Sequence, residues 1–221
     1  MTGAERQLTL RVLSALLRED VLGLRSGAAL ERRADGPWLR SGRFGLPVVA
    51  DGFQCAYAAR LPLLAVDGVE LTGLPDILAR LAEEADPPDR PGHLAFAEEC
   101  RQTLATMELH ERVRDGVHER LAETYGADPA RWSGLGPSLA FDTLAAYLDH
   151  PVYPTARGRS GLTVSHLTAY APEFHPSFEL RWLAVPPASW TRTAPGRCPT
   201  GGRAPAGSAC TAPTRPFRCI R

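Results

Sequence analysis

The chain has 221 residues, and 44% of them are hydrophobic, which is enough to build a buried core. Its 25 basic and 25 acidic side chains give a formal net charge of zero, so no overall field draws the protein to nucleic acid or to an anionic membrane. The sequence contains no lysine, which excludes chemistry that needs a lysine amine, such as a Schiff base. Any anion site must therefore be local and built from arginine.

The first twenty residues mix charges with apolar residues and lack the pattern of a secretory signal. No segment approaches the roughly 18 uncharged apolar residues that a membrane-spanning helix needs. We therefore predict a cytoplasmic protein. The five cysteines form no C-x-x-C pair, so we expect no disulfide framework and predict that Cys55 and Cys100 are small buried hydrophobes.

Hydrophobic spacing predicts both helices and strands in the first part of the chain. Leucines and a valine recur at helical spacing within 4–23 and predict an amphipathic helix. A polar, glycine-rich stretch then leads to apolar runs at 46–50 and 57–66, which we predict to be strands. The pairs Asp51-Gly52 and Asp67-Gly68 are typical of hairpin turns.

Three further helices are predicted, at 74–84, 93–126 and 137–148. Proline in the first turn and an early acid favour the start of the 74–84 helix, and Asp86-Pro87-Pro88 ends it. The longest helix carries His110 and His118 close to one face, each followed by glutamate. The two histidines lack the i, i+4 spacing of H-E-x-x-H, so we predict a solvated charged face and no metal site.

The last part of the chain is predicted to hold a loop at 149–161, a short helix at 164–170 capped by Thr163, and a strand at 178–186. The tail at 189–221 contains no aspartate, glutamate, leucine or valine, so we predict that it is disordered. Its arginines would allow salt-sensitive contacts with nucleic acid, but a gene read out of frame gives the same composition, and we favour that second interpretation. We therefore expect a domain at 1–188 and an aberrant tail at 189–221.

The loop DHPVYPTARGRSG concentrates basic residues among residues that stiffen the backbone. Two prolines fix φ angles and restrict the residues before them, which favours a rigid loop. Arg157 and Arg159 could converge on one anion if the chain bends at Gly158, because two guanidinium groups suit phosphate or carboxylate oxygens. The alternative is that the arginines are solvated or paired with surface carboxylates.

The segment 150–186 resembles the signature region of the IucA/IucC family of siderophore synthetases, which work without a nonribosomal peptide assembly line. That family carries H-P-x-H-P-x-x-K-x-R-x-G, then a short helix, then Y-x-P-E-F and a strand. The matching residues are His150, Pro151, Pro154, Arg159, Gly161, Tyr170, Pro172, Glu173 and Phe174. Two positions depart from the pattern: Tyr153 stands in place of the second histidine and Arg157 in place of lysine. Arg157 keeps the positive charge, whereas no role is carried over to Tyr153.

The resemblance implies an acid–amine ligase that uses ATP and Mg²⁺. A carboxylic acid such as citrate or a succinyl derivative becomes an acyl-adenylate, and an amine or hydroxylamine then forms an amide or hydroxamate with release of AMP. We expect His150, Arg157 and Arg159 to bind ATP and the adenylate, because cationic donors stabilise the developing charge. For the Y-x-P-E-F segment we predict structural roles: Tyr170 and Phe174 pack, and Glu173 pairs with an arginine or caps the backbone.

The resemblance also implies an α+β fold that forms the N-terminal helical and mixed lobe of such a synthetase, and a homodimer as its assembly. We expect the chain to be a truncated N-terminal portion, because later segments with further ATP and carboxylate contacts are absent from it, and we expect it to be inactive alone. The alternative function is a non-catalytic module that binds a nucleotide or carboxylate, or that docks on an intact synthetase. A third interpretation is nucleic-acid binding through the tail.

Overall fold

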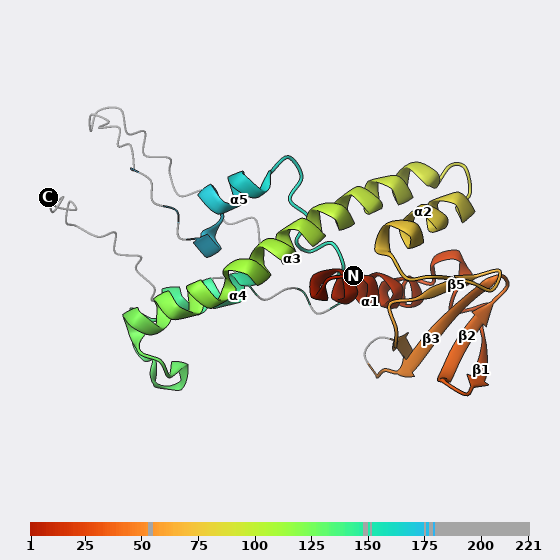
Figure 1. Cartoon of the computed structure of the whole chain (residues 1–221), viewed down its shortest axis with the longest axis horizontal. Coiled ribbons are helices and arrows are strands. Elements are labelled where there is room, and N and C mark those ends of the chain that lie inside the picture. Colours follow the sequence, from red (N-terminus) through yellow and green to blue (C-terminus); the bar gives the residue numbers. More distant parts are fainter. Residues whose placement is uncertain (53–54, 148–149, 151, 175, 177–178, 180–221) are drawn as a thin grey trace, which may run out of the picture. The chain divides into compact units, whose positions relative to one another are not determined.

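The computed structural model describes residues 1–52, 55–147, 150, 152–174, 176 and 179. Its α-helices are α1 (Gly3–Arg18), α2 (Leu74–Glu84), α3 (Arg90–Tyr125), α4 (Ser138–Tyr147) and α5 (Val164–Tyr170), and its short 3₁₀ helices are η1 (Val21–Gly23), η2 (Pro129–Arg131) and η3 (Pro172–Phe174). The strands are β1 (Ala29–Arg33), β2 (Gly36–Ser41), β3 (Phe44–Ala50), β4 (Tyr57–Ala59), β5 (Leu64–Val66) and β6 (Val69–Leu71). Helices combined with an antiparallel sheet confirm the predicted α+β class (Figure 1).

The strands form one antiparallel sheet in the order β1-β2-β3-β5-β6, with β4 paired to β3 beside this path. Val66 pairs with Val69, so β5 and β6 are joined by the predicted two-residue turn at Asp67-Gly68. Both turn residues have positive φ, 52° and 83°, as a type I′ turn requires. The run predicted as one strand at 57–66 is instead two strands, because β4 pairs with the end of β3 and β5 pairs with its beginning.

Two strands lie where the sequence predicted only a polar, glycine-rich stretch. β1 is an edge strand with mostly exposed side chains, so it lacks the apolar alternation by which strands are recognised. β2 buries Trp38 and Leu39. The Trp38 indole Nε1–H donates to Asp35 at 3.0 Å, and the Arg33 guanidinium lies 4.0 Å from the centre of the indole ring. The predicted hairpin turn at Asp51-Gly52 lies between β3 and β4, where Ala50 pairs with Tyr57.

The main hydrophobic core lies between α1, α2, the sheet and the first part of α3. α1 begins after Thr2, whose Oγ1 accepts the backbone N–H of Glu5 at 3.1 Å. The apolar stripe predicted for α1 is buried except for Leu10, which is partly buried, and α2 has the predicted bounds. The largest fully buried apolar side chains of this core are Leu8, Leu13, Leu17, Leu46, Leu64, Ile77 and Leu81.

α3 extends beyond this core and organises the segment that follows α4. Its Leu109 packs with Leu167 and Ala171 at α5, and its Val117 and Leu121 pack with Ala140 of α4. Packing along one long helix therefore fixes the position of residues 152–174 (Figure 1).

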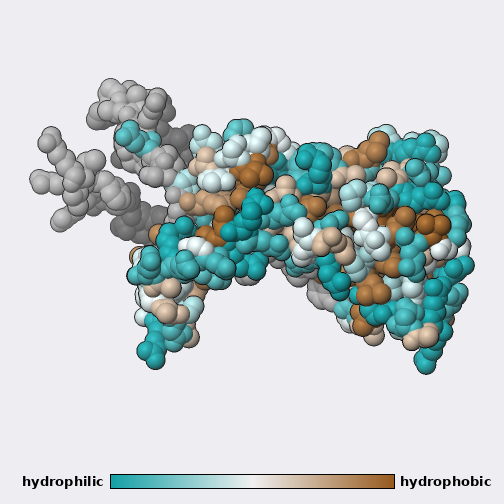
Figure 2. Space-filling view, viewed as in Figure 1, coloured by the Kyte–Doolittle hydropathy of each residue, from teal (hydrophilic) through white to brown (hydrophobic). Residues whose placement is uncertain are grey.

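Both cysteines of the described part were predicted to be buried. Cys100 is buried, whereas Cys55 is only half-buried. Figure 2 shows a mainly hydrophilic face with scattered hydrophobic side chains. Within the described residues, no helix combines the length and the apolar character needed to cross a membrane. The strand predicted at 178–186, apart from exposed Glu179, and the tail predicted at 189–221 lie outside the described residues.

Candidate functional site

The loop after α4 folds as two consecutive turns. The backbone N–H of Gly158 donates to the carbonyl of Thr155 at 2.9 Å, and that of Leu162 donates to the carbonyl of Arg159 at 3.0 Å. The first turn is buried at Thr155 and Arg157, which are 7% and 5% exposed. The first turn is therefore packed, whereas Tyr153 and residues 160–163 are exposed.

α3 holds this loop from one side. The Thr106 hydroxyl donates to the carbonyl of Arg157 at 3.2 Å, in a buried hydrogen bond. A Cβ atom at Gly158 would lie 3.1 Å from the carbonyl oxygen of Thr155 and 3.6 Å from that of Glu99 on α3. Glycine is thus needed at 158 for close packing, whereas the left-handed backbone occurs at Gly161, with φ +79°.

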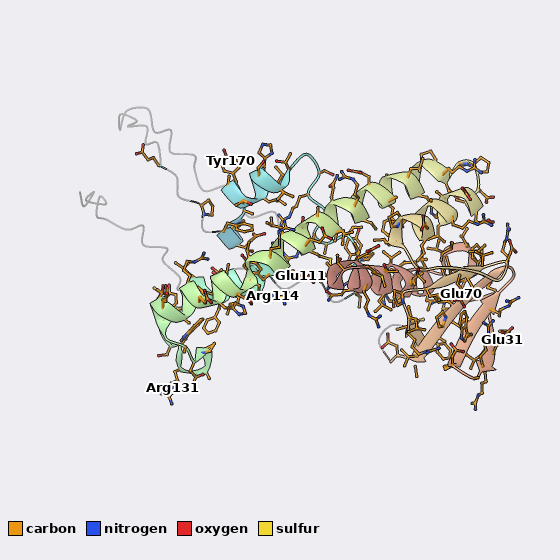
Figure 3. The ribbon with its side chains drawn as sticks, viewed as in Figure 1. Glu31, Glu70, Glu111, Arg114, Arg131 and Tyr170 are labelled. Atoms are coloured by element: carbon orange, nitrogen blue, oxygen red, sulfur yellow. The ribbon has the colours of Figure 1, made fainter. Side chains whose placement is uncertain are left out.

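Arg157 lines a polar cavity of about 280 Å³. Other residues around it include Arg11, Glu111, Arg114 and Tyr147. Glu111 and Arg114 project from α3 beside the beginning of α1 (Figure 3). The cavity carries more basic than acidic groups, and Arg157 contributes a charge that is almost fully buried.

Arg159 lines a different cavity, of about 270 Å³, together with Arg101, Gln102 and Thr163. Its Nε atom is buried and has no hydrogen-bond partner. Gln102 Oε1 and Thr103 Oγ1, on neighbouring positions of α3, are likewise buried without partners. Buried polar atoms are rarely left unpaired, so a group of them at one place indicates a site for a polar ligand or water.

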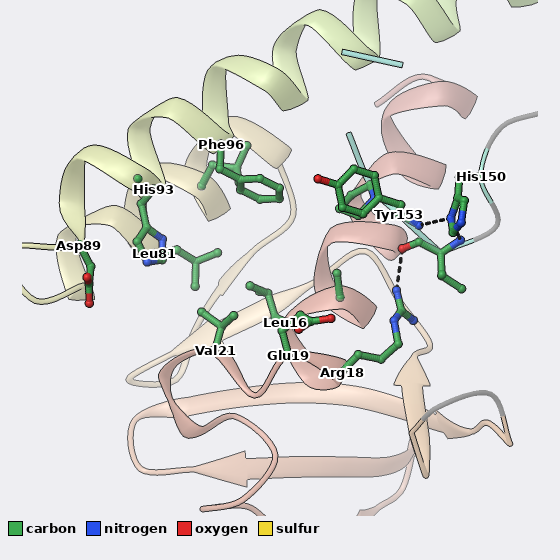
Figure 4. Close-up of a pocket in the computed structure, with 15 residues that line it drawn as sticks. Leu16, Arg18, Glu19, Val21, Leu81, Asp89, His93, Phe96, His150 and Tyr153 are labelled. Carbon is green, nitrogen blue, oxygen red and sulfur yellow. Dashed lines mark hydrogen bonds between the residues drawn. The ribbon is translucent and has the colours of Figure 1, made fainter. Parts of the chain in front are cut away.

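His150 lines a third cavity, of about 640 Å³, between α1, α2, the start of α3 and the loop (Figure 4). Its walls are mainly apolar, and Leu16, Leu81 and Phe96 are among them. His150 Nδ1 accepts the backbone N–H of Tyr153 at 2.9 Å, so the imidazole also organises its own turn.

The three residues predicted to bind ATP therefore lie at three different cavities of the described structure. Arg157 and Arg159 do not share a cavity, and they belong to two consecutive turns, at 155–158 and 159–162. Sequence spacing alone did not reveal these turns. Of the three residues, Arg159 is the one whose buried guanidinium Nε has no hydrogen-bond partner.

The Pro-Glu-Phe segment makes a buried hydrogen-bonded contact with α3. Glu173 is 1% exposed, and its Oε1 lies 3.0 Å from Nε2 of His110 on α3. The Tyr147 hydroxyl donates to the Glu173 carbonyl at 3.3 Å, and the Tyr147 ring lies 4.7 Å from the His110 ring. His110 is 4% exposed, so its prediction as part of a solvated face is wrong. Glu173 has the predicted structural role, but with a histidine in place of an arginine.

The electrostatics of Glu173 follow from this contact. Burial alone would raise its pKa, but the hydrogen bond from His110, a backbone hydrogen bond and the positive charge of Arg159 together lower it. The pKa of Glu173 is therefore lowered, and the carboxylate is ionised at neutral pH. The His110 Nε2–H accordingly donates to it.

The short helix before this segment has the predicted cap. Thr163 Oγ1 accepts the backbone N–H of His166 at 3.2 Å, and His166 Nδ1 accepts the backbone N–H of Thr163 at 3.4 Å. Phe174 is half-buried against the cluster around Leu109, as predicted. Tyr170 is 74% exposed and points away from α3, so its predicted packing is wrong (Figure 3). Among the described residues no group of three or more acidic, histidine or cysteine side chains could hold a metal ion.

A model of the IucA / IucC family matches residues 138–200, which include α4, the loop, α5 and η3. This segment of the chain is therefore similar to the IucA/IucC family. The L-2,3-diaminopropanoate–citrate ligase of Staphylococcus aureus (strain NCTC 8325 / PS 47) is 51% identical over 39 residues, which are 18% of this chain and 7% of the ligase. The IucA/IucC match thus covers the loop on α3 and both of its turns, whereas α1, the sheet, α2 and α3 lie outside it.

Proposed function

We propose that the chain serves siderophore biosynthesis as part of a synthetase that joins a carboxylic acid to an amine or hydroxylamine. In the proposed reaction, a carboxylate oxygen attacks the α-phosphorus of ATP and pyrophosphate leaves. The amine nitrogen then attacks the acyl carbon, loses a proton, and AMP leaves with the electron pair of the broken C–O bond. The family match at 138–200 and the similarity to a diaminopropanoate–citrate ligase support this reaction class.

The observation that carries the proposal is the state of Arg159. This residue of the family motif borders a cavity with a buried Nε–H that no protein acceptor satisfies. Ligand pockets for drug-sized molecules usually measure about 300–1,000 Å³. The Arg159 cavity, at about 270 Å³, therefore suits part of a nucleotide, and its two arginines, Arg101 and Arg159, favour the phosphates.

The other two motif residues have a different part in this proposal. His150 holds its turn by accepting a backbone N–H, and Arg157 is buried at the centre of the first turn. In this proposal Arg159 contacts the phosphate directly. Arg157 adds positive charge without contacting it, and His150 stabilises the conformation of the loop. Mg²⁺ would arrive with the phosphates, since this ion usually keeps several waters and needs few protein ligands.

The proposal also places the reaction in the cytoplasm, where ATP is supplied. A homodimer stays a prediction, and so does the reaction's dependence on Mg²⁺. The carboxylic acid and the amine are proposed only as chemical classes.

The test compares two arginine variants of the full chain. We expect Arg159→Ala to weaken ATP binding by about ten- to a hundredfold in isothermal titration, because hydrogen bonds to charged groups contribute about 1.5–3 kcal/mol. The control is Arg131→Ala, which removes the same charge from η2, where the side chain is 87% exposed (Figure 3). Equal affinities in both variants would contradict the proposed role of Arg159. Exchange of labelled pyrophosphate into ATP in the presence of citrate or a succinyl acid tests the chemistry, and binding without exchange would favour the non-catalytic module.

A further inference from the structure

A buried pair joins the family segment to a helix outside the family match. His110 and Glu173 are separated by 63 positions, and their side chains are 5% and 2% exposed. Aromatic rings enclose the imidazole, with the centroid of Tyr147 at 4.7 Å and that of Phe174 at 6.2 Å. α3, α4 and η3 each contribute to this cluster, which makes the position of Glu173 well defined.

Arg159 lies close enough for its charge to act on Glu173, but the two side chains form no ion pair within 4.0 Å. Its buried Nε–H has no acceptor, and Glu173 is itself almost fully buried. A guanidinium and a buried carboxylate normally pair, since both gain from the contact. Glu173 Oε1 instead accepts from His110 at 3.0 Å. Whether Glu173 pairs with His110 or with Arg159 therefore decides whether the Arg159 guanidinium is available to another anion.

We propose that His110 is a positioning residue for the oxyanion site at Arg159. Its hydrogen bond holds the Glu173 carboxylate toward α3, and the Arg159 guanidinium thereby stays open to a phosphate or carboxylate ligand. Without this donor, Glu173 would be a buried carboxylate in need of a cation, and Arg159 is the one that would close on it. The identity of the ligand rests on the proposed function, whereas the competition between His110 and Arg159 for Glu173 does not.

The reactivity of Arg159 measures its openness directly. Phenylglyoxal modifies accessible guanidinium groups, and peptide mass mapping gives the rate at Arg159 relative to Arg131, which is 87% exposed in the same chain. The variant His110→Phe keeps a ring between Tyr147 and Phe174 but removes the donor. We expect it to slow modification of Arg159 at least about fivefold, the factor that corresponds to about 1 kcal/mol.

Two further variants separate positioning from general damage to the fold. The double variant His110→Phe/Glu173→Gln removes the carboxylate charge, and we expect it to restore the rate at Arg159. The conservative variant His110→Gln keeps an N–H donor and should retain most of that rate. An unchanged rate in His110→Phe, or a lowered rate that the double variant does not restore, would overturn the proposal. If His110→Phe unfolds, shown by circular dichroism, His110→Leu, which also lacks a donor, against His110→Leu/Glu173→Gln gives the same comparison, and a faster rate in the double variant is required.

ATP titrations of the same variants keep the two proposals distinct. If Arg159 reactivity follows the predicted pattern but the unmodified chain does not bind ATP, the positioning role stands and the proposed function fails. If ATP binds and His110→Phe leaves Arg159 reactivity unchanged, the positioning role fails alone.

Discussion

His110→Phe also makes a prediction about stability. The replacement keeps an aromatic ring 4.7 Å from Tyr147 but leaves Glu173, 1% exposed, without its hydrogen-bond donor. Loss of a hydrogen bond to a charged group, together with the cost of an unpaired buried carboxylate, should lower the free energy of unfolding by about 3 kcal/mol at pH 7. For a domain of this size that loss corresponds to a fall in Tm of about 6–12 °C.

The loss of stability in His110→Phe should depend on pH. The pKa of Glu173 is lowered in the folded protein, so its contribution to stability is present above the ordinary carboxyl pKa and is lost as pH falls through the folded-state value. In His110→Phe the burial of Glu173 remains while the donor is gone, so the carboxyl should be neutral at a higher pH. The stability difference between the two proteins should therefore shrink as pH falls below about 4.

Urea unfolding at pH 7 and at pH 3.5, followed by circular dichroism, measures both quantities. The exposed carboxylates are common to the two proteins and cancel in the difference. Glu173→Gln in the His110→Phe background should recover more than half of the loss at pH 7, because a neutral amide costs less to bury. A loss below about 1 kcal/mol, or an equal difference at both pH values, would refute the reasoning.

Two further predictions concern the packing of the loop and of α3. Gly158→Ala should lower Tm, because the new Cβ would lie 3.1 Å from a backbone carbonyl oxygen. Gly116→Ala should raise Tm slightly, because that position of α3 has open space for a Cβ. Calorimetry measures both, and a shift of Tm in the same direction for the two variants would show that the loop is less tightly packed. Iodoacetamide at pH 8 should label half-buried Cys55 much faster than Cys100, because burial raises the pKa of the Cys100 thiol to about 12. Mass mapping measures both rates, and similar labelling of the two thiols in the native protein would contradict the packing of Cys100.

The helices of this fold could be predicted from the sequence because their stabilising contacts are periodic. Leucines at helical spacing predicted α1, and turn chemistry predicted Asp67-Gly68 and the Thr163 cap. Strands β1 and β2 could not be found in this way. The side chains of β1 are mostly exposed, and β2 sets its two buried residues, Trp38 and Leu39, side by side among glycine, proline and polar residues, so neither strand alternates. The pairing of β2 also depends on β3, which follows it.

The site was less predictable, because its contacts join distant parts of the chain. Nothing in the order of residues states that Glu173 meets His110, or that two turns separate Arg157 from Arg159. One signal was present in the sequence. Cys100, Thr103, Met107 and His110 recur at intervals of three or four residues, which places the histidine on the buried stripe of α3. This periodicity indicates a third role for His110, as a buried residue of α3, besides metal ligand and solvated residue.

The central claim is that the loop on α3 presents Arg159 to the phosphates of a nucleotide. The most direct test is the rate at which phenylglyoxal modifies Arg159 in the full chain, with and without saturating Mg-ATP. We predict that ATP slows modification of Arg159 at least about fivefold and leaves Arg131 unaffected, since a bound phosphate covers the guanidinium. An Arg159 rate that ATP does not change, or an equal slowing at Arg131, would contradict the claim.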